Sequence, residues 1–124
     1  RKQPAYPCRL SAGGCRPCRG IIIRTAWLYS PYGNNFVNTM LRLGAEKDEV
    51  RVVRDQFGSP TYALDLARAI IRILPQIGGR KCEIFHFTDE GACSWAEFAK
   101  AIMDLSGSKC IVTPVTTAEY ASPT

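Results

Sequence analysis

The sequence predicts an α/β fold with at least partly parallel strands, because strand-like and helix-like segments alternate along most of its length. Residues 21–23 are three consecutive isoleucines, and an unbroken β-branched run is typical of a strand buried on both faces of a parallel sheet. Residues 63–74 place apolar side chains at i, i+3, i+4, i+7, i+8 and i+11, which predicts an amphipathic helix. These two periodicities are the basis of the predicted fold class.

The first half of the chain is expected to hold two helices and a second strand. One helix follows Asn35, which can cap its start, and Gly44 is expected to end it. The short apolar run 50–53 predicts the strand. The helix over 63–74 is expected to stop at Pro75 and the glycine pair 78–79.

The second half repeats the alternation. A strand is expected over 82–89, followed by a helix that opens with the capping-box pattern of Ser94 and Glu97. Gly107 is expected to end this helix. A last strand covers 110–115, and the residues after it are expected to fray outward.

Composition excludes several classes of protein. At 124 residues, with 46% hydrophobic and 22% charged residues, the chain is expected to be one ordinary globular domain. The first 20 residues hold five of the 16 cations and no acidic residue, so 16 − 5 leaves 11 cations against 11 acids elsewhere. A nucleic-acid-binding face would spread its charge through the fold, so no nucleic-acid partner is expected. Without an apolar run of membrane length we expect no membrane partner and a cytoplasmic protein.

Residues 1–19 form an atypical leader rich in cysteine, arginine and proline, and the domain is expected to cover 20–124. The leader holds Cys8, Cys15 and Cys18, so a zinc- or nucleic-acid-binding arm is one alternative. A fourth zinc ligand would have to come from far along the chain, from Cys82, Cys93, Cys110 or His86. The favoured interpretation is a leader outside the native fold, with no metal site.

The sequence offers no catalytic constellation of its own. It contains no glycine-rich phosphate loop, no Tyr-x-x-x-Lys pair and no Ser/His/Asp set with the spacing of a triad. The single histidine, His86, lies in a predicted strand and is interpreted as a residue of the sheet. We therefore expect no catalytic residue in this chain.

Three segments resemble, in order, the second half of the dTDP-4-dehydrorhamnose reductase family, within the extended short-chain dehydrogenase/reductase superfamily. They are IIIRTAWLYSPYGNNFVNTMLRLG, VRVVRDQFGSPTYALDLARAI and IFHFTDEGACSWAEFAKAIMDLSG, and the resemblance covers residues 20–124. It implies the C-terminal portion of an NAD(P)-binding Rossmann-like doubly wound fold, with its substrate-binding lobe. The family uses NADPH to reduce the 4-keto group of dTDP-4-dehydro-L-rhamnose in dTDP-L-rhamnose biosynthesis.

The resemblance also implies what this chain lacks. The family's cofactor loop and catalytic Tyr-x-x-x-Lys belong to its first half, so we expect a fragment that is inactive alone and binds no cofactor by itself. A non-catalytic nucleotide-sugar-binding or regulatory subunit with the same fold is the alternative. We also expect self-association, because half of a doubly wound fold leaves the edge of the 21–23 strand without a neighbour.

The resemblance implies a substrate site for the dTDP-sugar at the ends of the strands. Trp27 follows the first strand and is expected to cover the apolar side of the sugar ring, beside Thr25. Asn35 and Phe36 begin a helix, where ligand contact and a plain cap with a core contact are equally open interpretations.

The segment DQFGSPT (residues 55–61) carries the other four expected site residues. Gly58 would let the backbone approach a ligand, and Pro60 would fix the entry to the helix. Gln56 and Thr61 would donate side-chain hydrogen bonds, and free amides at the helix start would suit a diphosphate. The alternative is a capped strand-to-helix loop without a ligand.

Overall fold

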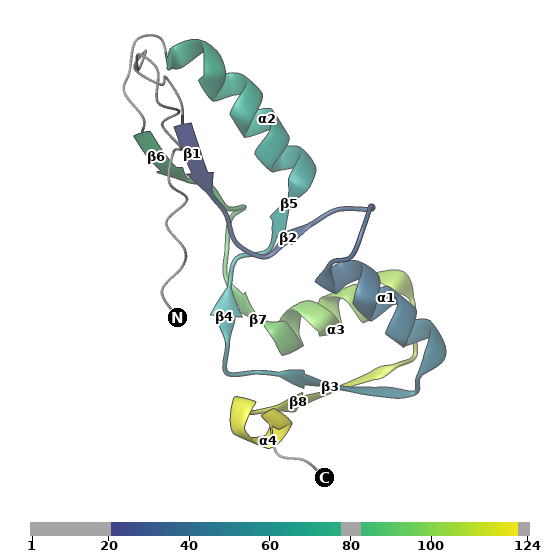
Figure 1. The fold of residues 1–124 in the computed structure, drawn as a ribbon. Coiled ribbons are helices and arrows are strands. Elements are labelled where there is room, and N and C mark those ends of the chain that lie inside the picture. Colours follow the sequence, from purple (N-terminus) through teal and green to yellow (C-terminus); the bar gives the residue numbers. More distant parts are fainter. Residues whose placement is uncertain (1–20, 78–82, 122–124) are drawn as a thin grey trace, which may run out of the picture.

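The computed structural model describes residues 21–77 and 83–121, which form two packed groups of elements (Figure 1). We call the first group the strand-pair unit; it consists of β1 (Ile21–Arg24), α2 (Ala63–Ile73) with the 3-10 turn η1 (Leu74–Gln76), and β6 (Glu83–His86). We call the second group the core unit; it consists of α1 (Phe36–Glu46), β3 (Glu49–Val53), α3 (Trp95–Ser106), β8 (Ile111–Val115) and α4 (Thr117–Ala121). Four short strands join the units: β2 (Leu28–Tyr29), β4 (Phe57–Gly58), β5 (Thr61–Tyr62) and β7 (Cys93–Ser94).

Strand pairing is mostly parallel, which confirms the predicted α/β class. β1 pairs with β6, placing Ile22 opposite Ile84, and β3 pairs with β8, placing Val52 opposite Pro114. β2 and β5 are also parallel, whereas β4 and β7 are antiparallel. At least one helix lies between the members of each parallel pair along the chain, as a parallel connection requires.

The hydrophobic core lies between α1, α3 and the β3–β8 pair. α3 buries Ala96, Ala99, Ile102 and Met103, which recur every three or four residues and therefore share one helix face. β3 alternates exposed and buried side chains, so one of its faces meets the helices. The other core members are Met40, Val50, Val52 and Cys110.

The predicted helix caps are confirmed. The side chain of Asn35 accepts a hydrogen bond from the backbone N–H of Asn38 at 3.0 Å at the start of α1. Ser94 and Glu97 form the reciprocal capping box at the start of α3. Gly107 ends α3 in the left-handed conformation, with φ of 69°, that glycine adopts most readily.

Gly44 lies inside α1 and does not end it, which corrects the prediction. The helix continues to Glu46, and its extended C-cap Lys47 donates its N–H to the carbonyl of Leu43 at 2.9 Å. A Cβ placed on Gly44 would lie 2.7 Å from the sulfur of Met103 on α3. Gly44 therefore permits the close packing of α1 against α3, rather than a left-handed turn.

The C-terminal segment also differs from the prediction, because a helix replaces the expected fraying end. The N–H and hydroxyl of Thr116 both donate to the carboxylate of Glu119, and the N–H of Glu119 donates back to the Thr116 hydroxyl. This capping box starts α4. The sequence carried the signal, since Thr-x-x-Glu at 116–119 has the same spacing as Ser94 and Glu97.

The remaining boundaries agree within a few residues. α2 ends at Ile73, and Pro75 lies in the 3-10 turn that follows, which confirms the predicted stop. The strand predicted over 82–89 covers Glu83–His86, and the one predicted over 110–115 covers Ile111–Val115. The leader, the glycine pair 78–79 and Cys82 lie outside the described residues. Within the described ranges no helix is both long and apolar enough to cross a membrane.

Candidate functional site

Aromatic side chains gather beside the short strands that join the two units. Trp27 and Trp95 stack with ring centroids 3.5 Å apart and planes inclined by 12°. Phe36 packs against Trp95 at a tilt of 48°, with ring centroids 4.5 Å apart, and stacks on Phe98 at 5.5 Å. We call this group the aromatic cluster; its members are Trp27, Tyr29, Phe36, Tyr62, Trp95 and Phe98.

Trp27 is held in an unusual backbone conformation. Its φ is 46°, and Trp27 is the one non-glycine residue with positive φ in the described part of the chain. Its carbonyl accepts a hydrogen bond from the N–H of Thr61 at 3.1 Å, while its ring stacks on Trp95. Such backbone strain persists only where surrounding contacts fix it, so the position of this indole is closely specified.

Position 58 must be a glycine because the indole of Trp27 occupies the space that any side chain there would need. A Cβ on Gly58 would lie 2.3 Å from the Trp27 ring, much closer than any real contact. β4 pairs with β7 across Gly58 and Cys93, and the carbonyl of Gln56 accepts the N–H of Trp95 at 3.3 Å. The segment 55–61 thus packs against both tryptophans, which accounts for its glycine without a ligand.

Two of the predicted site residues are fully engaged with the chain itself. The amide of Asn35 donates to the carbonyl of Ser30 at 2.8 Å in addition to capping α1. Thr61 is completely buried, and its hydroxyl donates to the carbonyl of Ser59 at 3.2 Å. Among the other predictions, Pro60 is half-buried in the loop and Thr25 is exposed just after β1. Their part in ligand binding stays a prediction.

One amide at the start of α2 is engaged within the chain, and because no side chain caps this helix, diphosphate binding by its other amides stays a prediction. The N–H of Tyr62 donates to the carboxylate of Asp89 at 2.7 Å. At the start of α3 the carboxylate of Glu97 accepts the N–H of Ser94 at 2.6 Å. A carboxylate at a helix start repels a phosphate from the position that would otherwise attract it.

A hollow of about 370 Å3 opens in the core unit beside the aromatic cluster. We call it the α4 hollow. Two predicted site residues, Phe36 and Gln56, contribute to its lining. The complete lining is Phe36, Met40, Arg51, Val52, Val53, Gln56, Trp95, Thr117, Tyr120 and Ala121. Three aromatic rings, one arginine and two uncharged hydrogen-bonding side chains face the same space, a combination that suits an aromatic base with polar substituents.

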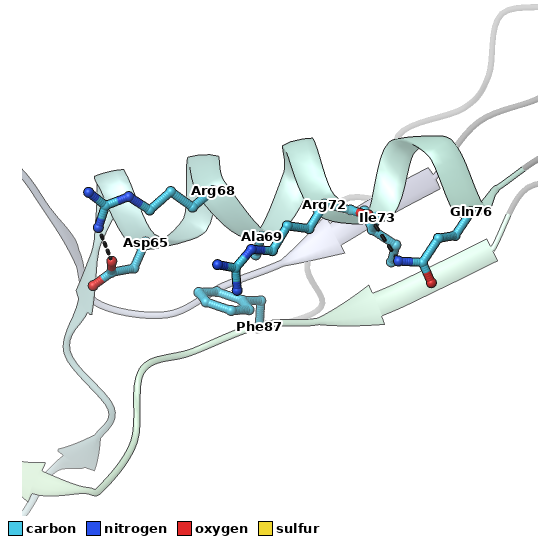
Figure 2. Close-up of a pocket in the computed structure, with 7 residues that line it drawn as sticks. All are labelled: Asp65, Arg68, Ala69, Arg72, Ile73, Gln76 and Phe87. Carbon is cyan, nitrogen blue, oxygen red and sulfur yellow. Dashed lines mark hydrogen bonds and ion pairs between the residues drawn. The ribbon is translucent and has the colours of Figure 1, made fainter.

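A second hollow of about 500 Å3 lies along α2 in the strand-pair unit. Figure 2 shows Arg68 paired with Asp65, at 3.3 Å, and the guanidinium of Arg72 close to the ring of Phe87. The rest of its lining is Ala69, Ile73 and Gln76, so none of the predicted site residues contributes. Exposed arginines along a helix are usually solvated, and we take the α4 hollow as the candidate site.

The titratable groups near the candidate site serve as structural acceptors. The hydrogen bond from the N–H of Thr117, and to a smaller extent the one from its hydroxyl, lowers the pKa of Asp55 below its ordinary value. Hydrogen bonds from Ser94 lower the pKa of Glu97 in the same way. Burial, with a smaller effect of the Asp89 charge, raises the pKa of Tyr29, and burial raises that of Cys93. Tyr29 and Cys93 therefore stay protonated at neutral pH, and neither is activated as a base or nucleophile.

The described residues contain no group of three or more His, Cys, Asp or Glu side chains placed to hold a metal ion. Cys93 and Cys110 are free thiols. The three leader cysteines of the zinc alternative lie outside the described residues.

Eight of the ten residues of the α4 hollow were not predicted as site residues, and the aromatic and polar ones among them come from three elements. Arg51 lies on β3, Trp95 opens α3, and Thr117 and Tyr120 belong to α4. Trp95 was detectable, because a large aromatic directly after a capping serine begins a helix with its ring near the neighbouring loops. The α4 residues depend on a helix that the sequence prediction did not include.

The mostly parallel pairings define an α/β chain, and solved structures of reductases share its fold. A dTDP-4-dehydrorhamnose reductase from Bacillus anthracis, solved in complex with NADP, superposes on 82% of this chain with a TM-score of 0.75 and 46% sequence identity. This chain covers 35% of that structure. The predicted fold, a C-terminal portion of such a reductase, is confirmed.

The sequence model of the RmlD substrate binding domain matches residues 16–124, and the chain belongs to that family. The spore coat polysaccharide biosynthesis protein SpsK of Bacillus subtilis strain 168 is 50% identical over 83% of this chain. A dTDP-4-dehydrorhamnose reductase of Aggregatibacter actinomycetemcomitans is 43% identical over 82% of it. The chain spans 35% and 38% of the length of these two relatives. The family resemblance predicted from the sequence motifs is thus confirmed.

Proposed function

We propose that this chain is the sugar-nucleotide-binding part of a dTDP-4-dehydrorhamnose reductase. The observation that carries the proposal is the family match over residues 16–124, supported by 43% identity to a reductase of that name. The substrate class is a dTDP-linked 4-keto sugar, and NADPH would supply the hydride in the complete enzyme. This chain would bind and orient the sugar nucleotide.

The starts of the two long helices of the core unit do not suit the pyrophosphate of the dinucleotide. The starts of α1 and α3 are occupied by Asn35 and Glu97, and the N–H of Tyr62 before α2 is taken by Asp89. The starts of α1 and α3 thus carry side-chain acceptors where a pyrophosphate would need open amides. We therefore derive no chemical step of the cofactor from this chain.

The α4 hollow supports a role in binding the nucleotide. The rings of Phe36, Trp95 and Tyr120 offer apolar faces for a thymine base, and the side-chain amide of Gln56 offers hydrogen bonds to its polar edge. Arg51 supplies a positive charge for a diphosphate. In this proposal Trp27 and Gly58 fix the aromatic cluster that supports the hollow, so they act on the nucleotide through Trp95.

A chimera tests the proposal. Residues 20–124 would replace the matching segment of the Aggregatibacter actinomycetemcomitans reductase, and oxidation of NADPH would be followed with dTDP-4-dehydrorhamnose as substrate. We expect turnover by the chimera and none by the 124-residue chain alone. A chimera that is folded and binds NADPH, yet leaves the sugar nucleotide unreduced, would refute the proposal and favour a non-catalytic subunit.

We propose further that the isolated chain self-associates through the strand-pair unit. Ile22 and Ile84 are directly paired on β1 and β6, and their side chains are 45% and 52% exposed. Within the described residues each of these strands has one neighbour only, so both outer edges offer unpaired backbone groups. Such edges and apolar side chains favour association with a second copy.

Sedimentation velocity at micromolar concentration tests this association. We expect a dimer or larger species for the native chain, and a shift toward monomer in the double variant Ile22→Lys/Ile84→Lys. Leu105→Lys is the matched control, because Leu105 is 90% exposed but lies on α3. A folded 13.7 kDa monomer of the native chain would contradict the proposal.

A further inference from the structure

α4 is held against the β3–β8 pair by side chains of β3 and of the segment just after it. Both carboxylate oxygens of Asp55 accept the N–H of Thr117 at 3.0 Å, and one of them also accepts its hydroxyl at 2.7 Å. Gln56 donates to the same hydroxyl at 3.1 Å. Arg51 donates to the carbonyl of Glu119 at 3.1 Å. These contacts join segments 61 to 68 positions apart in the sequence.

α4 depends on these contacts for its position. It has five residues, and none of their side chains is buried. A helix this short is not stable in isolation, and its own capping box fixes only its first turn. In Figure 1 it lies beyond the end of β8, on the opposite side of the β3–β8 pair from α1 and α3.

α4 is also one wall of the α4 hollow. Thr117, Tyr120 and Ala121 line the hollow together with Phe36 and Trp95 from the two long helices of the core unit. Asp55 does not belong to the lining, although it holds the first residue of α4. Any movement of α4 away from Asp55 would therefore change the width of the hollow.

We propose that Asp55 is a positioning residue: it fixes the start of α4, and the affinity of the α4 hollow for its ligand depends on this contact. The assignment of a thymidine diphosphate group as the ligand rests on the proposed function. The carboxylate suits the task, because a negative charge at a helix start is stabilised by the peptide dipoles. Arg54 beside it favours the same ionised form.

Hydrogen–deuterium exchange of the full 124-residue chain tests the structural step without a ligand. The variants are Asp55→Asn, which retains one acceptor oxygen, and Asp55→Ala, which retains none. We expect exchange of the 117–121 amides to rise about tenfold or more in the alanine variant and less in the asparagine variant. Amides of Val52 and Val112 in the β3–β8 pair should be unchanged. The matched control is Asp104→Asn, which removes an exposed ion pair with Lys100 on α3.

Titration with dTDP, followed by calorimetry, tests the coupling to the hollow. We expect Asp55→Ala to weaken binding about tenfold in a chain that is still folded by circular dichroism, and Asp104→Asn to leave the affinity within about twofold. Unchanged α4 exchange in Asp55→Ala would overturn the inference, and so would faster exchange with unchanged affinity. Absence of dTDP binding by the native chain would count against the proposed function instead, and the exchange experiment would still decide the role of Asp55.

Discussion

The core unit and the strand-pair unit use the same kinds of sequence pattern but bury very different amounts of side chain. The core unit contains every member of the hydrophobic core, including Ala99 and Met103, which are 0% and 2% exposed. The strand-pair unit has no buried residue in β1, α2 or β6. Its apolar side chains are instead half-buried or exposed, with Ile71 69% exposed.

The difference shows that an apolar pattern indicates a face to be covered, without indicating what covers it. α2 has a stronger helical periodicity than α1 or α3, yet the described residues bury its apolar side only in part. α3 meets α1 and the β3–β8 pair and is covered on its apolar side. The strand-pair unit thus leaves five large apolar side chains exposed and has no fully buried one beneath them: Ile22, Leu64, Ile71, Leu74 and Ile84.

Truncating one apolar side chain in each unit sharpens this comparison. Met103→Ala should lower the free energy of unfolding by about 2–5 kcal/mol, because it opens a cavity between α1 and α3. Ile71→Ala should lower it by less than about 1 kcal/mol, because the side chain is already exposed. Urea denaturation of dilute chain measures both. Equal losses would mean that the two units are covered alike in solution.

Gly58→Ala tests the link between the units, with a smaller expected effect. The added methyl group would overlap the ring of Trp27, so the indole must leave its stack on Trp95 or the loop must shift. Overpacking of this kind lowers stability by about 1–3 kcal/mol. Near-UV circular dichroism should lose the signal of the stacked indoles. Leu28→Ala, at a neighbouring and 46% exposed side chain, is the control that should retain it.

The sequence predicted elements well where the determinant was local. The caps at Asn35 and Ser94 and the stop before Pro75 depend on a few adjacent residues, and the structure confirms them. Gly44 was interpreted wrongly because its reason is a contact with Met103, which is far away in the sequence. The Thr-x-x-Glu pattern at 116–119 is also local and predicts the capping box of α4, although the sequence prediction had a fraying end there.

The site was less predictable than the fold for the same reason. Phe36 and Gln56 were expected to contact a ligand and do line the α4 hollow, but their neighbours Arg51 and Thr117 come from separate elements. Spacing along the chain cannot show which of these side chains share a space. The role of Gly58 against Trp27 also required the packed structure, since glycine alone indicates close approach without naming the partner.

Removing one cap should have a smaller effect, confined at first to the core unit. Ser94→Ala deletes the hydroxyl that accepts the N–H of Glu97 at the start of α3. Loss of such a cap lowers stability by about 0.5–2 kcal/mol. Ser94→Thr should restore most of it, because threonine offers the same acceptor. An alanine variant as stable as the native chain would show that the capping box contributes nothing to α3.

Acid should loosen the core unit before the strand-pair unit, and this is the smallest effect we expect. Hydrogen bonds from Thr117, Ser94 and Thr116, respectively, lower the pKa values of Asp55, Glu97 and Glu119. A carboxyl whose pKa is lower in the folded chain than in the unfolded chain stabilises the fold fully above its ordinary value of about 4. That contribution is lost as the pH falls through the lowered pKa. The contribution of these three carboxylates to stability should therefore be constant between about pH 6 and 7.5 and should decline below about pH 4. Amides of α3 and α4 should then exchange first.

Glu97→Gln should flatten part of the decline, whereas Glu46→Gln, which alters an exposed pair with Arg42, should not. If α2 amides opened at higher pH than those of α3 and α4, the three caps would not be the groups that set the acid limit.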